Sequence, residues 1–194
     1  MVGDTEQLAT SHVATLVQRV REGDQAAWDD LVARFSPMIW NIARSYRLSK
    51  SDAADVSQTT WLRLVEHLDR INQTERLGAW LATTARRECL RIIRAGDRVT
   101  VAEEGFIDDV DLTAVDPDIR VLAEERDRVL WEAYARLPAR CRVMLMLLTA
   151  EPSLSYKELS EVLDMPIGSI GPTRGRCLTA LRRVVVELGI TPED

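Results

Sequence analysis

Apolar residues recur at intervals of three and four along most of this chain of 194 residues. That spacing gathers them on one face of an α-helix. β-branched residues do not cluster in the alternating runs that mark half-buried strands. We therefore expect an all-α fold, made of two small helical domains that an acidic, flexible linker joins.

Start and stop residues divide the helical pattern into segments. Ser36-Pro37 should end one helix, because the residue before a proline disfavours helical backbone. Ser155 and Glu158 form a predicted capping box at the start of another. The expected helices span residues 13–21, 25–35, 38–46, 51–68, 79–94, 118–137, 139–149, 156–163 and 167–188.

The net charge of −6 is unevenly distributed. Residues 97–127 hold 11 of the 31 acids but only 3 of the 25 Lys and Arg residues, so the rest of the chain is slightly basic. Such a segment, with little hydrophobic periodicity, is typical of a flexible linker. We predict a linker at 96–119 between domains at 10–95 and 120–188.

The last two expected helices are separated only by the short turn at 164–168, which predicts a helix-turn-helix whose second helix enters a DNA major groove. The predicted buried face of that helix comprises Ile170, Cys177, Leu178, Leu181, Val184, Val185 and Leu188. Its predicted outer face comprises Ser169, Pro172, Thr173, Arg176, Thr179 and Arg183. Short polar and Arg side chains suit contact with bases and phosphates, although an ordinary helical hairpin remains the alternative.

The expected helix at 79–94 also has two unlike faces. Its apolar face comprises Leu81, Ala82, Ala85, Cys89, Ile92 and Ile93. The opposite face comprises Trp80, Thr83, Arg87, Arg91 and Arg94, with Arg86 beside them. Guanidinium groups beside an exposed aromatic ring suit a nucleic-acid groove. A solvated basic face with Trp80 in the core is the alternative.

In the expected helix at 51–68, one apolar residue lies among polar ones on the outer face. Trp61, Leu64, Val65 and Leu68 form the predicted buried face. Asp55, Gln58, Leu62 and Glu66 point away. An exposed leucine there suggests a partner surface, although a lone exposed leucine usually has no role.

No catalytic or metal-binding pattern is found. His12 and His67 are isolated, and no phosphate-binding loop or nucleophile motif occurs. The acids of the expected linker lack the apolar surroundings that raise a carboxyl pKa for acid catalysis. We expect no enzymatic activity, no cofactor and no bound metal.

Cysteines and targeting signals point to a cytoplasmic protein. Cys89, Cys141 and Cys177 are far apart and odd in number, so we expect reduced, small hydrophobic side chains. No signal peptide is indicated at the N-terminus. The longest apolar run, 143–148, is far shorter than the roughly 18 residues of a membrane span, so we expect no membrane insertion.

Together, four segments resemble the extracytoplasmic-function (ECF) subfamily of the sigma-70 family of RNA polymerase sigma factors. Residues 51–62 are similar to the acid-rich helix that grips the polymerase β′ clamp. Residues 78–87 resemble the start of the helix that recognises the minus-ten promoter element. Residues 137–142 resemble the opening of the fourth sigma domain, and 155–170 its helix-turn-helix for the minus-thirty-five element.

The resemblance implies a sigma factor with core RNA polymerase (β′ clamp and β flap) and promoter DNA as partners. Implied polymerase-binding residues are Asp52, Asp55, Gln58, Leu62 and Glu66. Implied minus-ten residues are Asn72, Gln73, Trp80, Thr83, Arg86, Arg87, Arg91 and Arg94. Implied minus-thirty-five residues are Ser169, Pro172, Thr173, Arg174, Arg176 and Arg183. The loop at 69–77 would receive a flipped base, and the linker would follow the RNA-exit path.

The chain departs from the family pattern at several positions. Ala54 replaces a common Glu, Arg87 a common Asn, and Gly171-Pro172 the usual Lys-Ser. Arg174 replaces an apolar residue, and the sequence leaves its role open. Inferring promoter preference from other members is therefore unsafe.

Two other functions remain open from the sequence: a stand-alone helix-turn-helix regulator, or a helical adaptor for protein partners. Members of the family are commonly held inactive by an anti-sigma factor or by contact between the two domains. The sequence does not choose between these forms of control.

Overall fold

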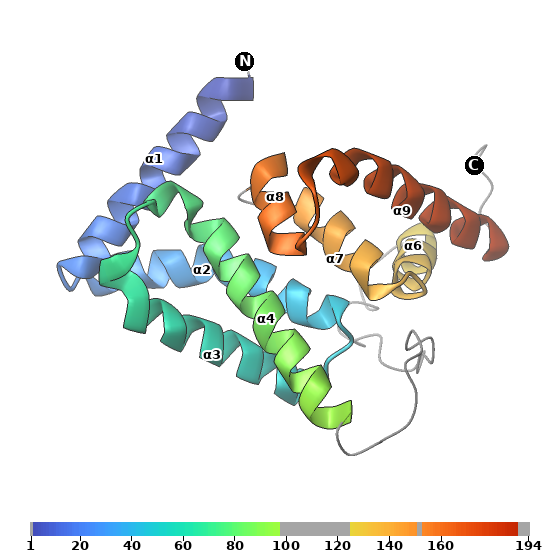
Figure 1. The fold of residues 1–194 in the computed structure, drawn as a ribbon, viewed down its shortest axis with the longest axis horizontal. Coiled ribbons are helices and arrows are strands. Elements are labelled where there is room, and N and C mark those ends of the chain that lie inside the picture. Colours follow the sequence, from blue (N-terminus) through green and yellow to red (C-terminus); the bar gives the residue numbers. More distant parts are fainter. Residues whose placement is uncertain (1, 98–124, 151–152, 190–194) are drawn as a thin grey trace.

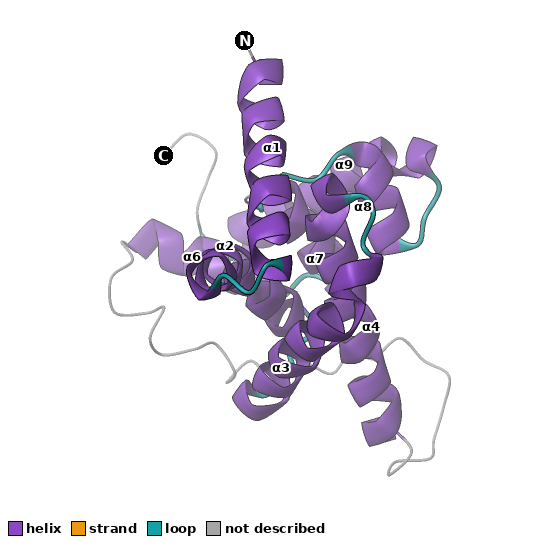
Figure 2. Ribbon diagram, turned by 90° about the vertical axis from the view of Figure 1, so that its left-hand side faces the viewer, coloured by secondary structure: helices purple, strands orange, loops and turns teal. Residues whose placement is uncertain are grey.

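The computed structural model describes residues 2–97, 125–150 and 153–189. Within these ranges the chain forms helices joined by turns, without a strand, so the all-α prediction is confirmed (Figure 2). The helices are α1 (Val2–Arg21), α2 (Gln25–Ser45), α3 (Lys50–His67), η1 (Leu68–Arg70), η2 (Thr74–Arg76), α4 (Leu77–Asp97), α6 (Glu125–Ala135), α7 (Ala139–Leu148), α8 (Tyr156–Leu163) and α9 (Ile167–Glu187). Residues 98–119 of the expected linker lie outside the described ranges.

The prediction that Ser36-Pro37 ends a helix is wrong, because α2 runs through Pro37 to Ser45. Proline removes one backbone donor and crowds the preceding turn. Here Leu31 and Phe35 before it and Ile39 after it lie on one continuous buried face. Packing of that face outweighs the local preference of the proline, as tertiary contacts often do.

Helices α1 to α4 form the N-terminal half of the structure, in which α2 contacts α1, α3 and α4. In α3, Leu64 is fully buried and Trp61 packs edge-on against Trp28 of α2. Val65 is 57% exposed, so its prediction as a core residue is wrong. The buried face of α3 is narrower than the apolar pattern suggested.

A buried carboxylate ties α3 to α4. Glu88 of α4 is buried and accepts hydrogen bonds from Arg63 Nε of α3 at 2.9 Å and from Arg91 Nε at 2.6 Å. Burial alone would raise the pKa of Glu88, but the hydrogen bonds and charges of Arg91 and Arg63 outweigh it and lower that pKa. The ion pairs thus stabilise the contact between the two helices.

Helices α6 to α9 form the C-terminal half and include the predicted helix-turn-helix. The capping box at Ser155 and Glu158 is confirmed. Asp164 adopts the left-handed conformation (φ 52°) that ends α8, and Ser160 Oγ donates to the Met165 carbonyl across the turn at 2.6 Å. In α9, Leu178 is 42% exposed, so its prediction as a core residue is wrong.

The two halves lie side by side (Figure 1). Their buried side chains form one continuous hydrophobic core. At its polar edge, Arg142 of α7 is buried and its Nε donates to the Ser45 carbonyl at the end of α2 at 2.8 Å. The same guanidinium donates to the Leu137 carbonyl. Burial, followed by the nearby charge of Arg47, lowers the pKa of Arg142 to about 10, so it stays charged at neutral pH. We call this contact the Arg142 seam.

Two more side chains complete the Arg142 seam. The Tyr134 hydroxyl of α6 donates to the Arg142 carbonyl at 2.7 Å and lies 3.1 Å from Ser45 Oγ. Arg47, just beyond α2, donates to the Ala135 carbonyl. The end of α2 is thereby linked to both α6 and α7.

The expectation that every cysteine is reduced is wrong for two of them. Cys141 of α7 and Cys177 of α9 form a disulfide, with 5.3 Å between their Cα atoms. They are 36 residues apart in sequence, and only the packing of α7 on α9 brings them together. Cys89 is free and buried, as expected.

The lowered pKa of Glu88 predicts how acid destabilises the fold. A carboxyl with a depressed folded pKa stabilises the protein above its ordinary pKa and loses that effect as the pH falls through the folded value. Glu88→Gln should therefore lose less free energy of unfolding than the wild type between pH 6 and pH 3, measured by urea unfolding.

Glu187→Gln is the matched control, because the Arg183–Glu187 pair is exposed and 3.5 Å long. Its pH dependence should follow the wild type. Equal pH dependence of Glu88→Gln and the wild type would contradict the role of Glu88.

Candidate nucleic-acid interface

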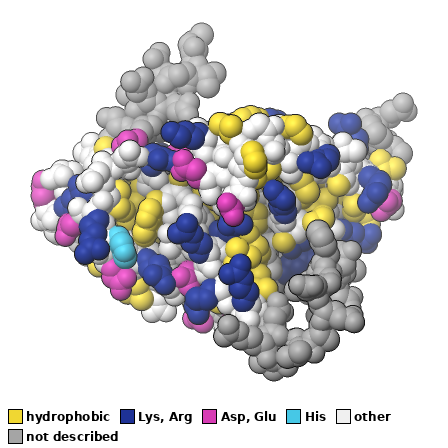
Figure 3. All heavy atoms as spheres, viewed as in Figure 1, with side chains coloured by type: hydrophobic (Ala, Val, Ile, Leu, Met, Phe, Trp, Pro, Cys, Tyr) yellow, Lys and Arg dark blue, Asp and Glu magenta, His cyan; other side chains and the backbone are white. Residues whose placement is uncertain are grey.

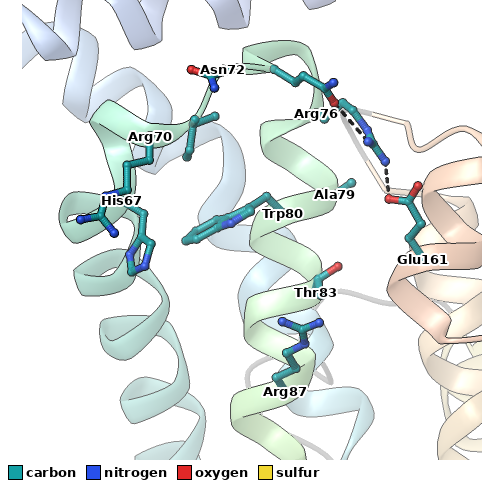
Figure 4. A pocket seen from close by; sticks show the side chains of 11 residues that line it. His67, Arg70, Asn72, Arg76, Ala79, Trp80, Thr83, Arg87 and Glu161 are labelled. Carbon is teal, nitrogen blue, oxygen red and sulfur yellow. Dashed lines mark hydrogen bonds and ion pairs between the residues drawn. The ribbon is translucent and has the colours of Figure 1, made fainter.

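A surface cavity of about 610 Å³ opens where the end of α3, the following loop and the first half of α4 meet. It is lined by His67, Arg70, Ile71, Asn72, Gln73, Arg76, Ala79, Trp80, Thr83, Arg87 and Glu161. The predicted site residues Asn72 and Gln73 of the loop thus meet Trp80, Thr83 and Arg87 of the helix in one place. Figure 4 shows side chains of this lining around the space between the end of α3 and α4.

Aromatic rings form one wall of the cavity. Trp80 is half-buried and its ring lies 6.2 Å from that of His67, tilted by 42°. His67 Nδ1 lies 3.0 Å from the Arg63 carbonyl, which fixes the orientation of the imidazole. The sequence suggested no role for His67, because Trp80 is far from it along the chain and only the fold brings them together. An aromatic ring such as that of Trp80 can stack on a nucleobase.

The cavity is also rich in guanidinium groups. Arg70, Arg76 and Arg87 line it, and the sequence had singled out only Arg87. Arg76 Nη1 donates to Gln73 Oε1 at 3.1 Å, which braces the loop. Arg70 and Arg76 could have been noticed as two basic residues flanking the loop positions Asn72 and Gln73.

The other predicted arginines of α4 lie outside the cavity. Arg86 is half-buried beside Tyr46, whose pKa is raised by burial and lowered in part by that guanidinium. Arg91 is exposed but paired with Glu88, and Arg94 is exposed near the end of the helix. Lys and Arg side chains are spread over the face of the molecule that Figure 3 shows.

The second candidate surface is the outer face of α9. Pro172, Arg176 and Arg183 are exposed as predicted, whereas Ser169 and Thr173 are half-buried. Arg176 Nη2 donates to Thr173 Oγ1 at 3.2 Å. Arg174 is exposed and lies 3.3 Å from the Tyr156 hydroxyl of α8, to which it donates.

Two glycines interrupt the exposed face of α9 without serving the packing of this chain. A Cβ built on Gly171 or Gly175 meets no atom within 4 Å, and neither residue has a positive φ. Glycine inside a helix costs about 1 kcal/mol relative to alanine. What these positions offer is close approach of an external backbone or groove.

The third candidate surface is the outer face of α3. Asp55, Gln58 and Glu66 are exposed, and Leu62 is 56% exposed among them. Val65 extends this apolar strip by one turn. Asp52 differs from the others, because Ser49 Oγ donates to its carboxylate at 2.6 Å in the cap of the helix.

The chain is similar to known proteins over most of its length. The family described as Sigma-70 region 2 matches residues 31–99, which span most of α2, α3 and α4. The ECF RNA polymerase sigma-E factor of Haemophilus influenzae is 26% identical over 185 residues, covering 91% of this chain and 94% of that protein. The protein of the same name from Escherichia coli (strain K12) is 25% identical over 163 residues, covering 80% of this chain and 84% of that protein.

The chain thus contains a sigma-70 region 2 and is similar to the ECF sigma factors over most of its length. Two solved structures share the fold of this chain. The sigma factor RpoE in complex with the anti-sigma factor NepR from Bartonella quintana has a TM-score of 0.60 and 21% identity, covering 81% of this chain and 96% of that chain. CnrH in complex with the cytosolic domain of CnrY has a TM-score of 0.62 and 19% identity, covering 92% and 99%.

This similarity supports the sigma-factor prediction over a stand-alone regulator or an adaptor. Among the residues that the structure describes, no helix of the sigma factor is both long and apolar enough to cross a membrane.

The C-terminal half of the sigma factor lies against the cavity. Helix α8 packs on α4, and Glu161 of α8 forms an ion pair with Arg76 at the edge of the cavity (Figure 4). The Glu161 carboxylate thus pairs with the Arg76 guanidinium on this side of the cavity. Glu161 stays next to Arg76 on that side of the cavity for as long as the two halves remain packed.

The Arg142 seam should contribute far more stability than the Arg76–Glu161 pair. Arg142→Met leaves the Ser45 and Leu137 carbonyls without their donor and should lower the free energy of unfolding by about 3 kcal/mol. Glu161→Gln removes a partly exposed ion pair and should change it by less than about 1 kcal/mol. Urea unfolding of both variants measures the two values. A similar decrease in the free energy of unfolding of both variants would show that the Arg142 seam is not the main stabilising contact between the halves.

Proposed function

We propose that this sigma factor binds core RNA polymerase and directs it to promoters, where it supports DNA melting and the start of transcription. It would catalyse no reaction itself. The observation that carries the proposal is the presence of two basic surfaces on separate halves, one around Trp80 and one along α9. As the polymerase and the chromosome lie in the cytoplasm, so would the sigma factor.

The proposed division of the chain follows the two halves. Residues 10–95 would bind polymerase and the minus-ten element, and 120–188 would bind the minus-thirty-five element. Residues 96–119 would join them as an acidic linker. Two weak DNA sites become effective when polymerase fixes their separation, because the second contact is then intramolecular.

The outer face of α3 would dock on the polymerase clamp. Its exposed carboxylates and Gln58 surround the apolar strip of Leu62 and Val65. An apolar centre with a polar rim is the usual anatomy of a protein interface. Asp52 would act through the helix cap as well as by contact, because it already binds Ser49.

The cavity would receive one base flipped out of the minus-ten duplex. Trp80 and His67 supply a stacking surface, and Asn72 and Gln73 supply amide groups that can pair with a base edge. The arginines around it would bind the neighbouring phosphates and extend this contact along α4; they are Arg70, Arg87, Arg91 and Arg94. Arg86 would support the site from its position beside Tyr46.

Helix α9 would lie in the major groove of the minus-thirty-five element. Arg176 and Arg183 are exposed on its outer face, with Ser169, Pro172 and Thr173 nearby. Such residues suit contact with phosphates and base edges. Arg174, held near Tyr156, would bind a phosphate between α8 and α9.

Packing of α8 on α4 would weaken DNA binding by the free sigma factor, because it places a carboxylate beside the cavity. With Glu161 on Arg76, the free sigma factor would bind promoter duplex weakly, and its negative net charge adds to this effect. Docking on polymerase would separate the halves and release the minus-ten surface. An anti-sigma partner would act on the same equilibrium.

In vitro transcription on a library of genomic fragments tests the function. Core polymerase should initiate at specific sites only when the sigma factor is present. Leu62→Asp should reduce its affinity for core, and transcript yield at limiting concentration, at least about tenfold, because it places a charge in the apolar centre of the interface.

Leu62→Met is the matched control and should keep most activity, because it preserves volume and hydrophobicity. Specific initiation by Leu62→Asp at the wild-type level would refute the clamp surface. No initiation by the wild type with core, or tight operator binding without core, would refute the proposed function.

Gly175→Ala tests the approach of DNA to α9. The added methyl group meets no atom of the chain, so helix stability should rise by about 1 kcal/mol. The same methyl group would stand between α9 and the groove, so transcription from promoters with a minus-thirty-five element should fall.

Val186→Ala is the control for Gly175→Ala. Val186 is exposed near the end of α9, and alanine there favours the helix without adding bulk. Transcription by this variant should match the wild type. Increased stability of Gly175→Ala with unchanged transcription would contradict close approach of DNA at that position.

A further inference from the structure

The disulfide between Cys141 and Cys177 joins the first turn of α7 to the middle of α9. Cys177 is buried, as are Ile170 and Val184 on the same face of α9. The bond therefore holds the DNA-reading helix of the proposed function against the helix that carries Arg142. Neither DNA contact nor polymerase docking explains the need for a covalent tie there.

The surroundings of Cys141 suit a reactive thiol. Cys141 lies in the first turn of α7, where the positive end of the helix dipole favours an anion, and its sequence neighbours are Arg140 and Arg142. It is half-buried, so a small oxidant can reach it. Cys177 is buried next to it and follows Arg176. Two thiols of this kind can act as an attacking and a resolving cysteine.

Cys89 provides the contrast within the same chain. Burial raises the pKa of the Cys89 thiol to about 12, so it stays protonated and unreactive at neutral pH. In the structure it has no disulfide partner.

We propose that Cys141 and Cys177 form a reversible redox site that controls how firmly α9 is held. This proposal rests on the proposed function in one respect: a protein that works beside polymerase lies in a reducing compartment, where disulfides are mostly transient. The oxidised state is the one in the structure, and the reduced state has two free thiols.

A peroxide is the class of oxidant that balances the step. The Cys141 thiolate attacks one peroxide oxygen, the O–O bond breaks, and the departing hydroxide takes a proton to become water. The Cys177 thiolate then attacks the sulfenic sulfur of Cys141, forming the S–S bond and breaking the S–O bond, and a second water leaves. Two thiols are oxidised while one hydrogen peroxide is reduced to two waters. A thiol such as glutathione reverses the step by exchange.

The first test counts thiols in the full-length protein. It is equilibrated with mixtures of reduced and oxidised glutathione, quenched, denatured and alkylated, and the mass is measured. One alkylated cysteine, Cys89, should change to three as the mixture becomes reducing, and hydrogen peroxide should restore one. Cys89→Ala is the control: both counts fall by one and the midpoint stays the same.

Two results of this test would overturn the proposal. One is a pair that stays free in every mixture and after peroxide. The other is a bond that no glutathione mixture reduces, since the disulfide would then be permanent and not a switch. Both readouts are independent of polymerase, so they stand even if the proposed function fails.

The second test asks whether the bond affects the DNA-reading half. The oxidised protein should melt about 10 °C above the reduced protein, because the bond restricts the unfolded chain. Cys141→Ser/Cys177→Ser should melt at one temperature in both conditions. In transcription at a temperature between the two midpoints, the oxidised wild type should give more transcript than the reduced one. Equal melting, or equal transcription at that temperature, would overturn the link between the bond and α9.

Discussion

The burial of Arg142 between the two halves is the contact on which the rest of the structure depends. A guanidinium removed from water must find acceptors, and the acceptors here are the carbonyls of Ser45 and Leu137. The hydrogen bond from Arg142 to the Ser45 carbonyl holds the end of α2 against α7. The Tyr134 hydroxyl completes the same polar edge, while hydrophobic packing forms one core from both halves. In the same packed arrangement α8 lies on α4, so that Glu161 borders the cavity.

In that arrangement two of the proposed binding surfaces are exposed, while the third is partly covered. The surfaces that we assign to polymerase, on α3, and to the minus-thirty-five element, on α9, carry exposed side chains in the packed form. The cavity that we assign to the minus-ten element is bordered by Glu161 of the opposite half. A chain organised in this way would meet polymerase first and open the minus-ten site afterwards. Stability of the seam would then set the energy that polymerase docking must supply.

Helix type and most helix bounds could be predicted from the sequence, because the three-to-four spacing and the capping box at Ser155 act locally. Pro37 misled the prediction, since continuous burial of α2 outweighs a local preference. Val65 and Leu178 misled it because an apolar residue does not say whether its own chain or a partner covers it. Of the site, Trp80, Thr83 and Arg87 could be found from one helix face. The approach of His67, the pairing of Arg76 with Glu161 and the Cys141–Cys177 bond depend on contacts between distant segments, and no local pattern reports them.

The distance between the two halves, measured with and without core polymerase, tests the central claim most directly. Spin labels on Asp69→Cys and Lys157→Cys report on the loop after α3 and on α8, both exposed. In the oxidised protein Cys89 is buried and the other two native cysteines are bonded to each other, so labels applied in that state attach to the introduced thiols. We predict one short distance in the free protein and a longer one in the holoenzyme. A distance that stays short in a transcriptionally active holoenzyme would contradict the opening of the two halves.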